Sequence, residues 1–372
     1  MYNLFDYLAW RGDLPVAADG FNDIDAVILS RLSYLPFDGI VSDCFQNYTT
    51  VSQAADRMFS EGEPSFLWEG DDRLMKELAQ SERFCGMKLS GYVNRVDDER
   101  QMQFAALLIT IDESTRFVSF RGTDNTIVGW QEDFNLFFTF PLASQFEAKR
   151  YWEEAADRFG GSFYLGGHSK GGNLAVYAAS FCAEALQDKI TAVYSMDGPG
   201  FELEHMKDSG FERIKDRIHT YVPQSSIFGM LLEHEESYTV IQSSQRGFLQ
   251  HDVYSWEVER TSLVKLDEVN GTSVFFDRTL TRFIANMPPE ERKAFTEEIF
   301  GILRSTEEMT FDEMADNWLR DTGKIFRTLK GLDASSRSML ASKLLQLVKA
   351  AGKNVSALKP APKDKKKAKK EP

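Results

Sequence analysis

The sequence predicts an α/β fold in which a mostly parallel central sheet carries helices on both faces. Two observations predict it. Three segments with the two-residue period of strands follow one another between residues 88 and 122, and helical and strand patterns then alternate from residue 146 to residue 244. Such alternation is typical of parallel strands joined by helices that cover the sheet.

Hydrophobic periodicity places the individual elements. Apolar residues recur at helical spacing in "NDIDAVILSRLSYL", where Asn22 or Asp23 can cap the first turn. Helices are expected at 22–35, 51–61, 71–80, 146–159 and 173–186. Strands are expected at 88–96, 104–111, 116–122, 162–167, 190–196, 218–224 and 238–244.

The chain of 372 residues is long for one simple domain, so additions to a core domain are expected. Helical patterns with apolar stripes lie at both ends, and the α/β pattern lies between them. We therefore expect an N-terminal helical region at 1–85, an α/β core at 86–270, a C-terminal helical subdomain at 271–352 and a basic tail at 353–372. The tail consists of Pro, Ala and Lys with almost nothing to bury, which predicts disorder.

Charge is distributed unevenly along the chain. The formal net charge is −14, but residues 353–372 hold eight lysines against Asp364 and Glu371, a balance of +6, so residues 1–352 carry −20. An acidic body is not expected to bind nucleic acid. The basic tail is either a solubilising appendage or a segment that contacts anionic surfaces such as lipid or RNA.

Cysteine usage and hydropathy indicate a cytoplasmic protein. Cys44, Cys85 and Cys182 are odd in number and widely spaced, which argues for reduced thiols and against a disulfide framework or a zinc site. The N-terminus, "MYNLFDYLAWRGDLP", has an aspartate in its apolar run and no basic start, unlike a secretory signal. No uncharged apolar stretch approaches the roughly 20 residues that cross a bilayer. The oligomeric state stays open.

The pentapeptide Gly167-His168-Ser169-Lys170-Gly171 lies where a predicted strand meets a helix expected to begin near Gly171. A sharp turn at such a place lifts a serine hydroxyl clear of the sheet, and flanking glycines let strand and helix approach. The helix N-terminus also directs its dipole toward developing negative charge. We therefore predict that Ser169 is a nucleophile on an elbow formed with Gly167, His168 and Gly171. The alternative is a glycine-rich loop before a helix.

A serine hydroxyl needs a histidine to take its proton, and a carboxylate normally holds that histidine in the right tautomer. Four histidines follow the serine in the chain, namely His205, His219, His234 and His251. His251 follows the last predicted strand, from which a loop can return over the sheet edge, and it is the predicted base. His219 lies in a strand pattern typical of a packed histidine, whereas His205 and His234 have acidic neighbours typical of the surface.

Asp197 is the leading candidate for the acid. It stands at the carboxyl end of a predicted strand in "VYSMDGPG", and active sites of open α/β sheets lie at that edge. The alternative is an aspartate that only caps the turn. Asp252 is adjacent to His251 in the chain and badly placed to reach its ring, and the next strand end offers only Ser225 and Ser226.

A nucleophilic serine also requires two backbone N–H groups that bind the oxyanion of the tetrahedral intermediate. One is expected from Lys170, which follows the serine, and the other from Thr123, where the chain leaves a strand at Gly122. The aromatic segment 128–142, "VGWQEDFNLFFTFPL", comes next. It is a candidate lid or acyl-binding wall, and buried packing under the sheet explains it equally well.

These motifs in combination carry a resemblance. "VSFRGT" followed by Trp130 and Asp133, then "GGHSKGG", resembles the class 3, fungal-type lipases of the α/β-hydrolase superfamily. "YLAWRGDLP", "GHSKGGNLAVYAA", "DGPGF" and "QHDVYSW" are similar to an uncharacterised bacterial lipase-like family. The resemblance covers about residues 1–260.

The resemblance implies an α/β-hydrolase fold in which Ser169 is the nucleophile and His251 the base. It also implies that the amides of Thr123 and Lys170 bind the oxyanion. Fungal-type lipases usually carry their acid after the strand that here ends in "YVPQSSIFG", where a serine stands in its place. Either the acid is Asp197 or the triad is incomplete, and an incomplete triad lowers activity by orders of magnitude.

We therefore expect a serine hydrolase that cleaves carboxylic esters of small molecules or lipid-like acyl groups through a Ser-Asp-His triad and an acyl-enzyme. This chemistry requires no metal and no organic cofactor. Two alternatives stay open: a non-catalytic α/β-hydrolase scaffold used as a binding module, and a thioesterase or peptidase with the same triad. The acyl chain length does not follow from the sequence.

Overall fold

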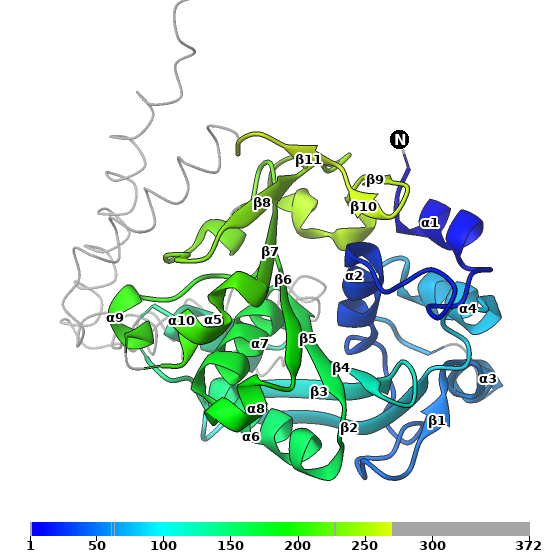
Figure 1. Cartoon of the computed structure of the whole chain (residues 1–372), viewed down its shortest axis with the longest axis horizontal. Helices are drawn as coiled ribbons and strands as arrows, with labels where there is room; N and C mark the ends of the chain where they lie inside the picture. The colour runs from blue at the N-terminus through cyan, green and yellow to red at the C-terminus, as the bar shows by residue number, and fades with distance from the viewer. Residues whose placement is uncertain are drawn as a thin grey trace, which may run out of the picture.

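A nine-stranded sheet forms the centre of the computed structural model, which describes residues 2–269 except 61, 63, 138, 208 and 227. The strands lie in the order β1-β2-β3-β4-β5-β6-β7-β8-β11 (Figure 1). Their bounds are β1 (Thr49–Thr50), β2 (Lys88–Asp97), β3 (Met102–Thr110), β4 (Thr115–Phe120), β5 (Ser162–His168), β6 (Ile190–Met196), β7 (Ile218–Pro223), β8 (Tyr238–Ile241) and β11 (Lys265–Leu266). A separate pair is formed by β9 (Val258–Glu259) and β10 (Ser262–Leu263). The predicted helical subdomain at 271–352 and the tail at 353–372 lie outside the described residues.

The sheet is parallel only in its middle. β4 to β8 pair in parallel, whereas β1 to β4 are antiparallel neighbours and β11 is antiparallel to β8. The α/β class is confirmed, but the prediction of a mostly parallel sheet was wrong for the outer strands. The reason is the short turns at 98–101 and 111–114, because so short a connection can only return the chain in the antiparallel direction.

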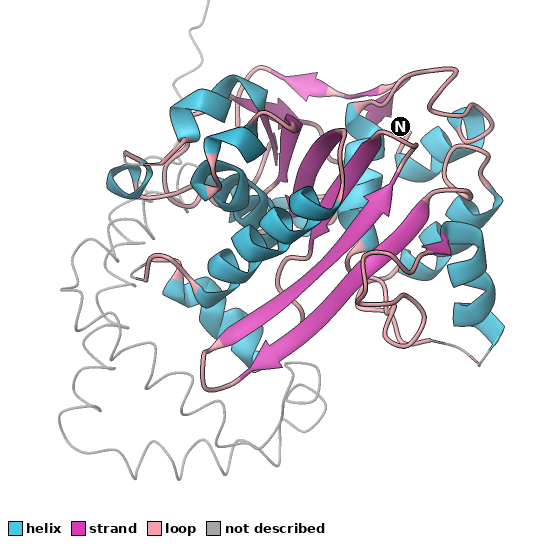
Figure 2. Cartoon of the chain, turned by 60° about the horizontal axis from the view of Figure 1, so that its bottom comes forward, coloured by secondary structure: helices cyan, strands magenta, loops and turns pink. Residues whose placement is uncertain are grey.

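Helices lie on both faces of the sheet, as predicted (Figure 2). Their bounds are α1 (Leu4–Arg11), α2 (Asp23–Leu32), α3 (Val51–Ser60), α4 (Asp71–Gln80), α5 (Ile127–Asn135), α6 (Ala143–Arg158), α7 (Lys170–Phe181), α8 (Glu184–Gln187), α9 (Leu203–Met206) and α10 (Phe211–Ile214). Short 3₁₀ helices are η1 (Lys215–Arg217), η2 (Phe228–Met230), η3 (Gly247–His251) and η4 (Val253–Ser255). None of the helices in the described part of the chain has the length and apolar character needed to cross a membrane.

The central strands bury side chains in two separate hydrophobic clusters. Ile109 and Phe117 belong to the cluster that includes α1 to α4. Leu108 and Val118, their neighbours along β3 and β4, belong to the cluster that includes α6, α7 and α10. Because successive side chains of a strand point to opposite faces, this two-sided burial explains the continuous apolar run "FAALLITI".

A buried ion pair holds the N-terminal helices together. Asp25 of α2 accepts hydrogen bonds from Arg83 Nε and from Tyr7 Oη of α1, each at 2.8 Å. The side chains of Asp25 and Arg83 are fully buried. Arg83 also donates to the backbone carbonyls of Leu14 and Gly20. One guanidinium therefore ties α2 to the loop between α1 and α2.

Replacing Asp25 with Asn should lower the free energy of unfolding by about 3 kcal/mol, because Arg83 would remain as a buried charge without its carboxylate. Urea unfolding followed by tryptophan fluorescence measures this loss. The matched control is Glu154→Gln in the exposed pair Arg158–Glu154, which should cost less than about 0.5 kcal/mol. Equal losses in the two variants would contradict a stabilising role for the buried pair.

Candidate active site

Ser169 lies at a sharp turn between β5 and α7. Its backbone has φ 58° and ψ −134°, a conformation that a residue with a side chain adopts only when its surroundings enforce it. The Ser169 N–H donates to the carbonyl of Met196 at the end of β6, at 2.8 Å. The turn therefore projects the serine from the carboxyl end of β5, beside the carboxyl end of β6.

Glycines on both sides of Ser169 are required by the close approach of β4. A Cβ on Gly167 would lie 2.4 Å from the carbonyl oxygen of Phe120, and a Cβ on Gly171 would lie 2.1 Å from the same oxygen. Both distances are too short for any side chain. The G-x-S-x-G spacing thus allows the end of β4 to pass directly against the turn.

The carboxylate of Asp197 orients the ring of His251. Asp197 follows β6, has a φ of 53° and is fully buried. Its Oδ2 accepts a hydrogen bond from His251 Nδ1 at 2.6 Å. Because Nδ1 carries the proton in this bond, the neutral ring has its lone pair on Nε2, where it can accept a proton from a hydroxyl.

The second oxygen of this carboxylate is also satisfied. Ser226 Oγ and the Gly229 N–H, the latter at 3.1 Å, donate to Asp197 Oδ1. A Cβ on Gly229 would lie 2.2 Å from that oxygen, so glycine is the residue that permits this contact. The sequence marks Ser226 only as a position without a carboxylate. In the structure its hydroxyl binds the carboxylate supplied by the neighbouring strand.

His168 fixes the backbone of His251. The His168 ring is almost fully buried, and its Nε2 donates to the His251 carbonyl at 2.7 Å. Tyr34 follows α2, and its hydroxyl oxygen lies 3.1 Å from His168 Nδ1. The same hydroxyl accepts a hydrogen bond from the Gly122 N–H at 3.1 Å. Burial, with smaller contributions from His251 and Arg31, lowers the pKa of His168 well below its usual value. His168 is therefore a neutral positioning group.

His251 lies beside His168, the residue that precedes Ser169 in the chain. The rings of His168 and His251 have centroids 4.3 Å apart, and Phe228 of η2 lies 4.4 Å from the His251 ring. Within residues 2–269 as described, the Ser169 hydroxyl donates no hydrogen bond to His251. Free enzymes often hold this bond loosely, and it tightens when substrate binds.

The two expected oxyanion donors flank Ser169. Lys170 is the first residue of α7, and the N–H of a first helical residue has no partner within the helix. A Cβ on Gly122 would lie 3.0 Å from Ser169 Cβ, so the peptide that leads to Thr123 passes beside the serine. The Thr123 hydroxyl donates to the carboxylate of Asp133 at 2.6 Å. This bond fixes the loop that carries the Thr123 amide.

The side chain of Lys170 points away from the site into a buried ion pair. Its Nζ donates to Glu132 Oε2 at 2.7 Å and to Gln103 at 3.0 Å, and both charged side chains are 1% exposed. Glu132 lies on α5 and also accepts from the Ser144 N–H at the start of α6. The inner face of α5 is therefore buried packing, whereas Phe134 on the same helix is 39% exposed.

The remaining candidate histidines lie apart from Ser169. His219 was predicted to be a packed histidine, and this was wrong, because it is exposed on β7 with its ring stacked on Tyr194. His205 stacks on Phe140 near the surface. His234 was predicted to be a surface residue, and this was wrong, because its side chain is only 5% exposed. His234 pairs with Glu236 in the interior. The acidic pattern "LLEHEES" is typical of a surface segment, so the sequence did not indicate this pairing.

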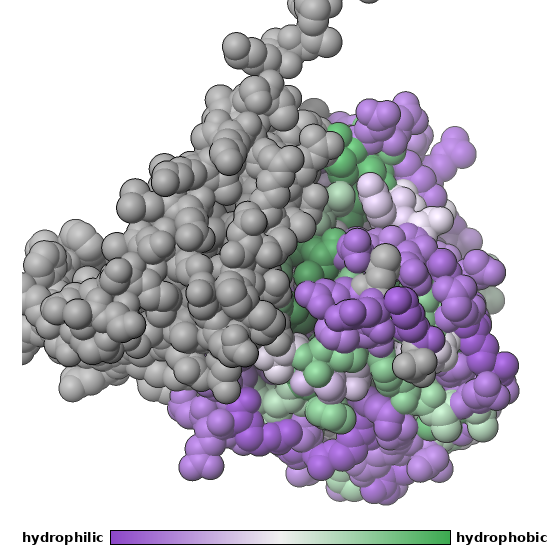
Figure 3. Space-filling view, turned by 90° about the vertical axis from the view of Figure 1, so that its left-hand side faces the viewer, coloured by the Kyte–Doolittle hydropathy of each residue, from purple (hydrophilic) through white to green (hydrophobic). Residues whose placement is uncertain are grey.

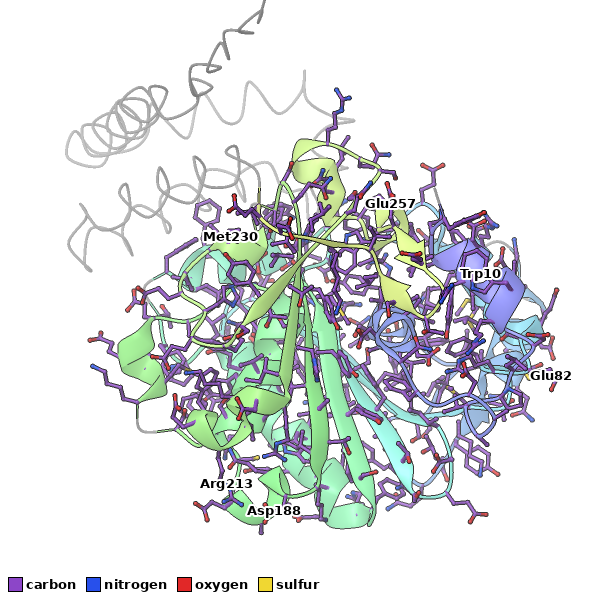
Figure 4. The ribbon with its side chains drawn as sticks, turned by 45° about the horizontal axis from the view of Figure 1, so that its top comes forward. Trp10, Glu82, Asp188, Arg213, Met230 and Glu257 are labelled. Carbon is purple, nitrogen blue, oxygen red and sulfur yellow. The ribbon has the colours of Figure 1, made fainter. Side chains whose placement is uncertain are left out.

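Ser169 and Asp197 directly follow β5 and β6, and Figure 4 shows which edge of the sheet holds the carboxyl ends of the parallel strands. Asp188 and Arg213, which precede β6 and β7 and form an ion pair at 2.6 Å, lie at the bottom of the sheet. Met230, which ends η2 after β7, lies at the top. Ser169, Asp197 and the η2 segment therefore share one edge of the sheet, which is the edge where open α/β sheets bind ligands.

Asp133 is a carboxylate in an unfavourable environment. Burial raises its pKa from 3.8 to about 6, against the lowering effects of Lys170 and of the hydrogen bond from Thr123. Between pH 4 and 6 the folded protein therefore binds more protons at this residue than the unfolded chain does. The free energy of unfolding consequently falls as pH rises through this interval and reaches a plateau above it.

Replacing Asp133 with Asn should remove the free-energy cost of burying an ionised carboxylate, because the amide carries no charge. Its oxygen can still accept the hydrogen bond from Thr123. We expect the variant to be more stable than the wild type by about 2 kcal/mol at pH 7.5 and by almost nothing at pH 3.5. Urea unfolding at both pH values measures the difference. A difference that is the same at the two pH values would contradict a raised pKa at Asp133.

Comparison with known proteins places the site within a matched region. A family model described as Mbeg1-like matches residues 78–301, which is more than half of the chain. The matched region contains Ser169, Asp197 and His251 but begins after Tyr34. No curated protein matches the chain.

Proposed function

The chain belongs to the Mbeg1-like family, which is associated with lipase-like proteins, and we propose that it is a serine hydrolase acting on carboxylic esters. The observation that carries the proposal is the 2.6 Å hydrogen bond from His251 Nδ1 to the buried carboxylate of Asp197, beside a serine in a strained turn. A capping aspartate has no need of a histidine partner. This pairing supports Asp197 as the triad acid over an incomplete triad.

In the proposed reaction, Ser169 Oγ attacks the acyl carbon of the ester while His251 Nε2 takes the hydroxyl proton. Asp197 stabilises the imidazolium that forms, and the N–H groups of Thr123 and Lys170 bind the oxyanion. His251 then gives the proton to the departing alkoxide, and the alcohol leaves. Water, deprotonated by His251, attacks the acyl-enzyme and releases the carboxylic acid and free Ser169.

The order of the strands supports an α/β-hydrolase fold of the class 3 lipase type. β4 leads to Thr123, its neighbour β5 leads to Ser169, and the next neighbour β6 leads to Asp197. Three adjacent parallel strands thus supply an oxyanion donor, the nucleophile and the acid. The acid stands one strand earlier than in fungal-type lipases, and Ser226 occupies the later position as a donor to it.

Apolar surface near the site favours acyl or lipid-like substrates. Leu249, two residues before His251, is 54% exposed, and Phe134, next to Asp133, is 39% exposed. Figure 3 shows apolar surface (green) among hydrophilic side chains (purple) on the face that it presents. An acyl chain that approached Ser169 could bury such side chains, and each buried methylene contributes roughly 0.8 kcal/mol.

The second candidate function is a binding module that keeps the fold without catalysis. It is favoured by one observation, which is that the Ser169 hydroxyl forms no hydrogen bond to His251 in the described residues. A thioesterase or a peptidase would use the same groups as the esterase.

Cys44, Cys85 and Cys182 are free thiols in the described part of the chain, which supports a cytoplasmic location.

A fluorophosphonate probe tests for an activated serine. We expect covalent labelling of the purified protein at Ser169, located by peptide mass spectrometry, because the probe reacts with serines whose proton a base removes. Ser169→Ala should abolish labelling, whereas Ser180→Ala, a serine buried in α7, should leave it unchanged. A folded wild-type protein without any label at Ser169 would favour the binding module.

Replacing Asp197 with Asn should lower kcat/KM for a short-chain p-nitrophenyl ester by about 10³-fold or more, because an amide favours the wrong tautomer of His251. Asp252→Asn is the matched control, since Asp252 is adjacent to His251 but caps the Tyr254 N–H. The control should keep kcat/KM within about threefold of the wild type. Near-normal turnover in the Asp197 variant would remove Asp197 from the triad.

A further inference from the structure

A second buried histidine–carboxylate pair lies one loop away from the proposed triad. His234 Nδ1 lies 2.8 Å from Glu236 Oε1, and its Nε2 lies 2.7 Å from the Gly229 carbonyl oxygen. The side chains of His234 and Glu236 are 5% and 7% exposed. The Thr220 hydroxyl of β7 also donates to Glu236 Oε1, at 2.7 Å. Neither residue has a role in the reaction described above.

The bonding partners assign two protons to the His234 ring. A backbone carbonyl can only accept, so Nε2 must donate to Gly229. Although burial opposes ionisation of Glu236, His234 and Thr220 lower its pKa, so this carboxylate also only accepts. Burial likewise opposes the charge on His234, but Glu236, the Gly229 carbonyl and Asp197 together raise the pKa of His234. His234 is therefore a buried cation with both N–H groups engaged.

Gly229 connects this cation to the triad acid. Its carbonyl accepts from His234, and its own N–H donates to Asp197 Oδ1 at 3.1 Å and to Ser226 Oγ at 3.0 Å. The adjoining residue Phe228 places its ring against His251. The position of Gly229 thus determines whether its N–H reaches Asp197 and whether the neighbouring Phe228 ring contacts His251.

We propose that His234 is a positioning residue for the triad, which holds Gly229 so that its N–H binds Asp197 and η2 stays against His251. This inference rests on the proposed function, because it assigns His234 to the same reaction. Glu236 orients the His234 ring and Thr220 orients Glu236. The relay therefore runs from β7 through two side chains and one peptide to the acid.

His234 acts on Asp197 through its positive charge as well as through the hydrogen bonds of Gly229. Among the described residues, Glu236 and Asp197 act on the charge of His234, and the ring of Tyr238 has its centroid 6.1 Å from the His234 ring. The titratable groups that interact with His251 there include Asp197, Asp133, Asp252 and His168. The positive charge of His234 lies behind Asp197 and offsets part of the negative charge that faces His251. Removing the cation and the Gly229 donor should both make His251 more basic. The acidic limb of the kcat/KM pH profile should then move to higher pH.

Two variants of His234 separate the hydrogen bond from the charge. His234→Phe removes both, whereas His234→Gln keeps an N–H group that can reach the Gly229 carbonyl and removes only the charge. The matched control is His219→Phe, the same replacement on β7, where the ring is exposed and stacks on Tyr194. Each variant is measured for kcat, KM and the pH profile of kcat/KM with a short-chain p-nitrophenyl ester, and for melting temperature.

We expect His234→Phe to lower kcat by about tenfold with KM within about twofold, and to move the acidic limb upward by about half a pH unit. His234→Gln should recover most of kcat while it keeps part of the shift. His219→Phe should match the wild type. An unchanged pH profile in His234→Phe, or a kcat loss that His219→Phe reproduces, would overturn the proposal.

A measurement without substrate separates this inference from the proposed function. The proton on His251 Nδ1, held in a 2.6 Å hydrogen bond to Asp197, should give a far-downfield proton NMR signal that Asp197→Asn abolishes. His234→Phe should move this signal and His219→Phe should not. If the wild type takes no fluorophosphonate label but the signal moves, the relay stands and the hydrolase proposal fails. If labelling succeeds and the signal does not move, only the relay fails.

Discussion

The carboxylate of Asp197 is buried without access to water, and the arrangement of the site follows from satisfying its two oxygens. An ionised carboxylate is stable in such a place only when donors surround it. Here a histidine binds one oxygen, and a hydroxyl and a backbone N–H bind the other. These donors come from the loops after β7 and after β8. A single buried carboxylate therefore ties the loop after β7 to the loop after β8.

The elbow and the elements of the core were predictable from the sequence because their signals are local. G-x-S-x-G between an apolar strand and a helix specifies a turn in which β4 passes within contact of two glycines. The approach of His251 to Asp197 was predictable as well, because strand ends of a sheet meet at one edge. The antiparallel direction of the outer strands was also predictable, because the turns between them are short. The prediction of a mostly parallel sheet gave more weight to the alternation of helices and strands later in the chain.

The supporting residues could not be predicted, because nothing local distinguishes them. Ser226 is one hydroxyl in a polar loop, and His234 stands among glutamates that resemble a solvated surface. Each has its role only because a distant segment comes to lie beside it. Burial of His234 by Glu236 and Gly229 is a product of tertiary structure, and only the folded chain reveals it.

Tyr34, which follows α2, brings the N-terminal region into contact with the candidate site. Its hydroxyl joins the Gly122 N–H, next to Thr123, to His168, whose ring donates to the His251 carbonyl. The Mbeg1-like match begins at residue 78, after this tyrosine. Tyr34 therefore contacts the matched region from outside it. A recombination event that transferred residues 78–301 to a new chain would carry Ser169, Asp197 and His251 but leave behind the tyrosine hydroxyl that bonds to the Gly122 N–H and contacts His168.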